Sequence, residues 1–102
     1  MRLRVVYSRE ARADLHELFN YIAEQSGAER AAGYTRRITA YCRKLEVFPE
    51  RGSRRDDLWP GLRLIGFEGR VTIAFQVTAG EVRIVRVLYG GRELKPALFE
   101  GA

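Results

Sequence analysis

The chain has 102 residues, of which 46% are hydrophobic and 30% charged, as expected for one soluble globular domain over residues 1–102. No apolar run is long enough for a transmembrane helix and the first residues contain no secretory signal, so we expect a cytoplasmic protein without membrane contact. Lysine and arginine number 18 against 13 acidic residues, and this formal charge of +5 favours an anionic partner, either nucleic acid or an acidic protein segment.

Apolar spacing in the first half of the chain predicts a strand followed by two helices. Leu3–Tyr7 alternates as a short strand does, and Ser8 follows as a helix N-cap. Apolar residues then recur at helical spacing up to Gly27, and a second helix is expected from there to about residue 47, before Pro49. The connection is short, so the two helices should form an antiparallel hairpin.

Three residue types in these helices bear on possible chemistry. Gly33 costs helix stability, which indicates close approach to the first helix. Cys42 is the only cysteine and shares an apolar helix face, so we expect a small core residue rather than a nucleophile. His16, the only histidine, lies at the boundary of an apolar stripe. Without a second His, a Cys pair or a carboxylate pair of known spacing, we expect neither metal nor cofactor.

The second half predicts a sheet. A polar loop over residues 49–57 precedes three expected strands at residues 62–67, 70–77 and 82–89. Tight glycine-containing connections should make them an antiparallel meander. The expected class is α+β, with the helical hairpin covering one face of a four-stranded sheet. Residues 90–102 form a tail with at most a short helical turn near residues 94–99.

The last predicted strand is apolar on both faces. Strict alternation places Val82, Ile84, Leu88 and Arg86 on one face, and Val85, Val87, Tyr89 and Arg83 on the other. In the preceding strand it places Val71, Ile73, Phe75 and Val77 toward the core. A strand covered twice needs a second layer that the helices cannot supply. Either the tail folds over this face with Leu94, Leu98 and Phe99, or a partner chain covers it.

No catalytic residue is predicted. RNA cleavage would need a general base together with cations, and the sheet offers only Arg63, Arg70, Arg83, Arg86 and Tyr89. Arginine stays protonated and cannot serve as the base, which weakens a nuclease interpretation.

Several short motifs follow one another in a recognisable order. They are Ser8-x-x-Ala11-x-x-Asp14-Leu15, Tyr21-Ile22, Pro49-x-x-Gly52, Arg55-x-Asp57-Leu58, Leu62-Arg63 and Arg86-Val87-Leu88-Tyr89-Gly90-Gly91-Arg92-Glu93. Together, from residue 3 to about residue 94, they resemble the RelE/ParE toxin superfamily of type II toxin–antitoxin systems. The helix start and the Leu88–Arg92 ending are closer to the ParE-like branch.

The resemblance implies a helical hairpin on an antiparallel sheet and a cognate ParD-like antitoxin whose acidic C-terminal segment wraps the toxin. ParE-like members inhibit DNA gyrase by protein binding, without sequence-specific DNA contact. RelE-like members instead cut messenger RNA on the ribosome with basic sheet residues, and Tyr89 stands where many relatives carry histidine. The sheet has no lysine, which favours the ParE-like branch. A non-toxic relative is the third alternative.

Two contact surfaces are expected. Aromatic and arginine side chains dominate many interfaces, so the predicted antitoxin contacts are Trp59, Arg63, Arg70, Arg83, Val85 and Val87. The predicted target contacts are Arg86, Tyr89, Arg92, Lys95, Leu98 and Phe99. The tail residues combine cationic and apolar character, as a docking peptide would, but a structural clasp is an equal alternative.

Overall fold

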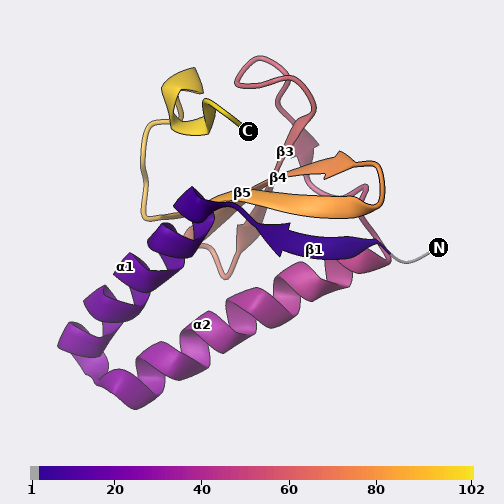
Figure 1. Cartoon of the computed structure of the whole chain (residues 1–102). Coiled ribbons are helices and arrows are strands. Elements are labelled where there is room, and N and C mark those ends of the chain that lie inside the picture. Colours follow the sequence, from indigo (N-terminus) through magenta and orange to yellow (C-terminus); the bar gives the residue numbers. More distant parts are fainter. Residues whose placement is uncertain (1–2) are drawn as a thin grey trace.

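The computed structural model describes residues 3–102, and its elements follow the predicted order (Figure 1). They are β1 (Arg4–Tyr7), α1 (Arg9–Ser26), α2 (Ala28–Arg43), the 3₁₀ turn η1 (Lys44–Glu46), β2 (Ser53–Arg54), β3 (Leu62–Phe67), β4 (Val71–Thr78), β5 (Glu81–Tyr89) and the 3₁₀ turn η2 (Pro96–Phe99). The α+β class, the helical hairpin and the antiparallel β3–β4–β5 meander are confirmed. Over residues 3–102, no helix combines the length and hydropathy needed to cross a bilayer.

The sheet has five strands, in the order β1-β5-β4-β3-β2, where four were expected. The additional strand, β2, has only two residues inside the polar loop, too few for a hydrophobic pattern to reveal it. The expectation of an antiparallel sheet is also wrong at one edge, because β1 runs parallel to β5. The α1–α2 hairpin serves as the long crossover that a parallel pair requires.

The hairpin forms where the capping residues predict it. Ser8 caps α1 by accepting a hydrogen bond from the Ala11 N–H at 2.9 Å, and Gly27 ends the helix with φ at 96°. The two helices cover one face of the sheet and extend beyond its edge (Figure 1). Gly33 does not mark a close approach, because a Cβ placed there would meet nothing within 4 Å.

A β-bulge in β5 changes which side chains face the helices. Phe75 pairs with Ile84 and the preceding Ala74 pairs with Arg86, so Val85 is an extra residue in β5. Beyond the bulge the alternation is inverted relative to the sequence prediction. The helix-facing cluster therefore contains Val82, Ile84, Val87 and Tyr89, whereas Val85 and Leu88 lie on the opposite face.

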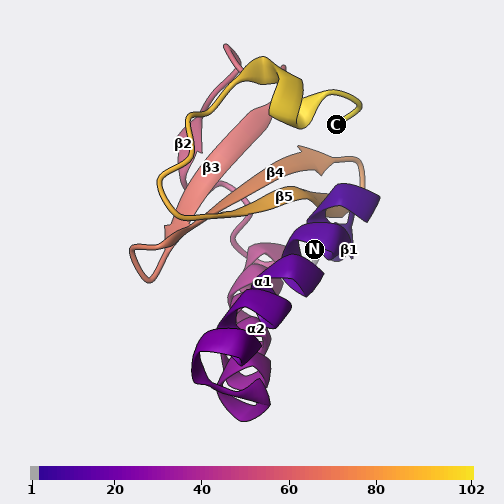
Figure 2. The ribbon, with the colours of Figure 1, turned by 90° about the vertical axis from the view of Figure 1, so that its left-hand side faces the viewer.

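The tail covers that opposite face (Figure 2). The tail-facing cluster comprises Leu58, Leu62, Ala74, Val85, Leu88 and Phe99, with Trp59, Leu64, Leu94, Leu98 and Ala102 packed around it. Phe99 is fully buried in this cluster. Of the two alternatives for the second face, the structure shows cover by the tail, and the face is not left open for a partner chain. The tail carries enough apolar side chains to form the missing layer.

Candidate functional site

A buried ion pair joins α1 to the bulge of β5. The Asp14 carboxylate accepts hydrogen bonds from Arg86 at 2.7 Å (Nε to Oδ2) and 2.9 Å (Nη2 to Oδ1), and from the Val87 N–H at 2.9 Å. Asp14 is 8% exposed, and these three donors compensate its lost hydration. The Asp14 carboxylate in turn raises the pKa of the Arg86 guanidinium. Arg86 is thus bound internally.

Ser8 provides a second link between α1 and the same bulge. Its hydroxyl donates to the Val85 carbonyl at 2.8 Å while accepting from the first turn of the helix. The motif Ser8-x-x-Ala11-x-x-Asp14 consequently has a structural explanation. Ser8 and Asp14 bind the backbone of Val85 and Val87, and Ala11, fully buried between them, lets α1 lie close to the strand.

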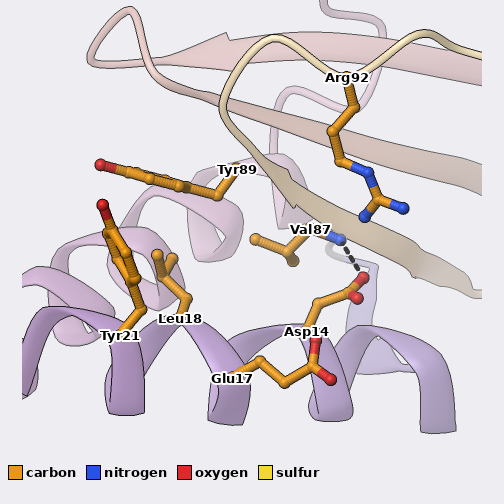
Figure 3. Close-up of a pocket in the computed structure, with 7 residues that line it drawn as sticks. All are labelled: Asp14, Glu17, Leu18, Tyr21, Val87, Tyr89 and Arg92. Atoms are coloured by element: carbon orange, nitrogen blue, oxygen red, sulfur yellow. Dashed lines mark hydrogen bonds between the residues drawn. The ribbon is translucent and has the colours of Figure 1, made fainter.

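An open cleft of about 180 Å³, the α1–β5 cleft, lies next to this ion pair (Figure 3). Its lining consists of Asp14, Glu17, Leu18, Tyr21, Val87, Tyr89 and Arg92. The rings of Tyr21 and Tyr89 contact each other with centroids 5.7 Å apart, and Tyr21 is half exposed. Figure 3 shows Arg92 extending from the start of the tail toward Asp14. Within residues 3–102, Arg92 has no ion-pair partner.

A second hollow of about 330 Å³ adjoins the α1–β5 cleft at Tyr89. Four of the residues that line this hollow are glycines, which expose backbone, and Arg70 is the one charged residue among its lining residues. Arg70, Tyr89 and Arg92 therefore lie along one continuous concave strip at the end of β5. This strip combines cationic and aromatic groups, the residue types that most often anchor a binding partner.

Comparisons with known proteins agree with this geometry. A sequence profile described as the ParE toxin of type II toxin–antitoxin systems, parDE, matches residues 5–94. The chain belongs to the ParE toxin family. Toxin ParE3 of Caulobacter vibrioides is 30% identical over 95 residues, covering 93% of this chain and 94% of that toxin. Toxin ParE1 of the same organism is 32% identical over 82 residues, covering 80% and 83%.

A solved structure described as the chromosomal ParDE TA system from P. aeruginosa shares the fold. Its TM-score is 0.77 at 23% sequence identity, and the match covers 88% of this chain and 98% of that chain. The resemblance to the ParE-like branch is confirmed.

The predicted antitoxin contacts of this ParE-family toxin do not form one surface. Arg63 pairs with Phe75, which faces the helices, whereas Arg83 pairs with Gln76 on the tail-covered face. Val85 and Val87 are 4% and 3% exposed, and the bulge directs them to opposite faces. The remaining two differ as well. Trp59 packs beside the tail-facing cluster, and Arg70 lies in the second hollow.

The predicted target contacts separate into buried and accessible residues. Arg86 and Phe99 are internal, and Leu98 is half-buried against the tail-facing cluster. Tyr89, Arg92 and Lys95 remain accessible on the ParE-family fold. Sequence reasoning missed Asp14 as a key residue. The available signal was a carboxylate between Ala11 and Leu18, both on the buried side of α1.

The basic loop before β3 is largely neutralised by its own acids. Arg55 makes a two-point ion pair with Asp57 at 2.9 Å, and Arg54 lies 3.2 Å from Asp56. The Gly61 N–H, and next the Arg54 guanidinium, lower the pKa of Asp56. These two acids lie in a turn, and they leave Arg63 as a nearby cation without an ion pair within residues 3–102.

The remaining reactive groups lie away from the cleft. Cys42 is fully buried in the helix-facing cluster, and burial raises the pKa of its thiol to about 11. His16 is exposed on α1. Among residues 3–102, no three His, Cys, Asp or Glu side chains are grouped so as to hold a metal ion.

Proposed function

We propose that this chain inhibits DNA gyrase by binding it and that a ParD-like antitoxin neutralises this activity. Membership of the ParE toxin family supports the toxin role. The observation that carries a binding mode, rather than RNA cleavage, is the Asp14–Arg86 pair. Arg86 is the sheet arginine next to the cleft, and its guanidinium is already bound to the Asp14 carboxylate. This cation is therefore unavailable to a phosphate group. Glu17 adds an acidic group to the same cleft and repels a nucleic-acid backbone.

The accessible residues of the cleft suit a protein target. Tyr21, Tyr89 and Arg92 place two aromatic rings and a guanidinium around one hollow, and this guanidinium has no ion-pair partner among residues 3–102. Aromatic and arginine side chains that insert into a partner carry much of the energy of an interface. We therefore assign the gyrase contact to this rim. Lys95 is exposed on the tail but does not line the cleft, and it stays a predicted target contact.

The antitoxin contact is assigned to the sheet edge beyond the hairpin. Glu50, Arg54, Gly61, Arg63 and Val77 line a shallow hollow there of about 220 Å³. Val77 is 41% exposed near the end of β4, although the sequence predicted a core position. An acidic segment with one apolar side chain could cover Val77 and pair with Arg63.

A supercoiling assay tests the gyrase assignment. Purified toxin should block supercoiling of relaxed plasmid by gyrase, and added antitoxin should restore it. Arg92→Ala should weaken inhibition. Arg37→Ala removes an exposed ion pair between Arg37 of α2 and Glu68 of the β3–β4 turn, away from the cleft, and should leave inhibition unchanged. Full inhibition by Arg92→Ala would refute the assignment of the contact to the cleft rim.

Ribosome-dependent RNA cleavage is the second candidate function. One observation favours it, namely that Arg70, Tyr89 and Arg92 line adjoining hollows where a phosphate could bind. Primer extension on ribosome-bound messenger tests it. Site-specific cuts that disappear in Tyr89→Phe would replace the gyrase proposal with this one.

A further inference from the structure

Arg86 binds two parts of the chain that are otherwise separate. Its Nε and Nη2 bind Asp14 on α1, while its Nη1 donates to the Leu98 carbonyl in η2 at 3.1 Å. The side chain is 16% exposed. One planar guanidinium thus fixes the distance between α1 and the tail, with Asp14 setting its orientation.

The remaining backbone hydrogen bonds of the tail do not attach it to the body of the protein within residues 3–102. The hydrogen bonds from Leu98 N–H to Lys95 and from Ala102 N–H to Phe99 are internal to the tail. Within residues 3–102, the Arg86–Leu98 bond is the only hydrogen bond that joins residues 92–102 to another element. The apolar side chains of the tail supply adhesion, but hydrophobic contact is non-directional and does not define the path of the backbone.

We propose that Asp14 is a positioning residue that acts through Arg86 to fix the tail and to direct Arg92 into the α1–β5 cleft. Asp14 lines the cleft and holds Arg86, and Arg86 holds Leu98, so the cleft and the tail are coupled through one ion pair. The consequence for gyrase binding rests on the proposed function. The consequence for tail order does not.

Substitutions of the pair separate positioning from general stability. In Asp14→Asn the amide N–H₂ would face the donors of Arg86, so the guanidinium loses its orientation while the shape of residue 14 is kept. Arg86→Lys keeps a cation beside Asp14 but lacks the planar fork that also reaches Leu98. Arg37→Gln is the matched control, because it removes another two-point arginine–carboxylate pair, with Glu68, on the exposed side of α2.

Amide hydrogen exchange of the full-length chain tests the proposal at the Leu98 and Ala102 amides of the tail, with the β4 amides as the reference. We expect exchange at both tail amides to become at least about tenfold faster in Asp14→Asn and Arg86→Lys, exceeding any change in β4, and to stay unchanged in Arg37→Gln. Unchanged tail exchange, or equal acceleration of the tail and β4, would overturn the proposal. If Asp14→Asn fails to fold, Arg86→Lys alone decides by the same criterion.

The supercoiling assay on the same variants addresses the tail's part in gyrase binding. We expect Arg86→Lys to lose inhibition in parallel with its looser tail. A loosened tail with full inhibition would overturn that part. If the wild-type toxin itself leaves supercoiling intact, the proposed function fails while the exchange result still decides the positioning role of Asp14.

Discussion

Arg63 and Arg83 project from opposite faces of the sheet. Arg63 lies opposite Phe75 and Arg83 opposite Gln76, and these two neighbouring residues of β4 point in opposite directions. The tail covers much of the face that carries Arg83, whereas the face that carries Arg63 is open beside Val77.

Antitoxin binding should therefore depend unequally on the two arginines. We expect Arg63→Ala to weaken binding by about 2 kcal/mol, a change of about 30-fold in Kd, because an acidic partner group loses its cation. Arg83→Ala should change Kd by less than about threefold. Calorimetric titration with the antitoxin measures both. A larger loss for Arg83→Ala would move the contact to the tail-covered face.

The Asp14–Arg86 pair should be a large contributor to folding stability. Asp14→Ala leaves a buried guanidinium without its carboxylate, which typically costs about 3–5 kcal/mol of unfolding free energy. Arg37→Ala removes an exposed pair and should cost under about 1 kcal/mol. Urea denaturation followed by circular dichroism measures the two costs. Equal costs would show that burial adds nothing to this pair.

Two glycines should respond to alanine in opposite directions. Gly52 has φ at +75°, and a Cβ there would lie 2.2 Å from the Leu64 carbonyl oxygen, so Gly52→Ala must displace β2 from β3. We expect a loss of about 3 kcal/mol. Gly33→Ala has open space and gains helix propensity, which should stabilise the fold by about 1 kcal/mol. Thermal melting of both variants provides the measurement, and a destabilised Gly33→Ala would contradict the open surroundings of Gly33.

Cys42 should make stability fall above pH 9. Burial raises the thiol pKa from 9.0 to about 11, so between these values the unfolded chain loses a proton that the folded chain keeps. A raised folded pKa gives stability that is present below pH 9 and is lost as the pH rises to 11, here about 3 kcal/mol. Cys42→Ala removes this term. Urea denaturation at pH 8 and pH 11 measures the unfolding free energy of both proteins. The difference by which the wild type exceeds Cys42→Ala should be smaller at pH 11 than at pH 8. A constant difference would mean that the thiol ionises freely.

Local sequence patterns predicted the elements of this fold well. Ser8 and Gly27 bound α1 because capping depends on the residue itself, and the bounds of β3 were predicted correctly from its apolar run between turn residues. The antiparallel meander followed from short connections. These features depend on contacts near in sequence.

The misplaced side chains of β5 have one physical origin, the bulge at Val85. The prediction assumed that successive side chains of the strand point to alternate faces of the sheet. The extra residue in the bulge breaks this alternation, so Val87 faces the helices and Leu88 faces the tail, the reverse of the prediction. The Asp14–Arg86 pair lay beyond prediction for another reason. Asp14 falls on the buried side of α1, but its partner is 72 residues away in the sequence, and only the fold brings the two together.

Parallel assays of supercoiling and translation test the gyrase proposal most directly. One preparation of purified toxin is added in molar excess to gyrase with relaxed plasmid, and to a reconstituted translation reaction programmed with messenger RNA. We predict that supercoiling stops or cleaved DNA accumulates, while translation continues and the messenger stays intact. Normal supercoiling together with site-specific cutting of ribosome-bound messenger would contradict the account.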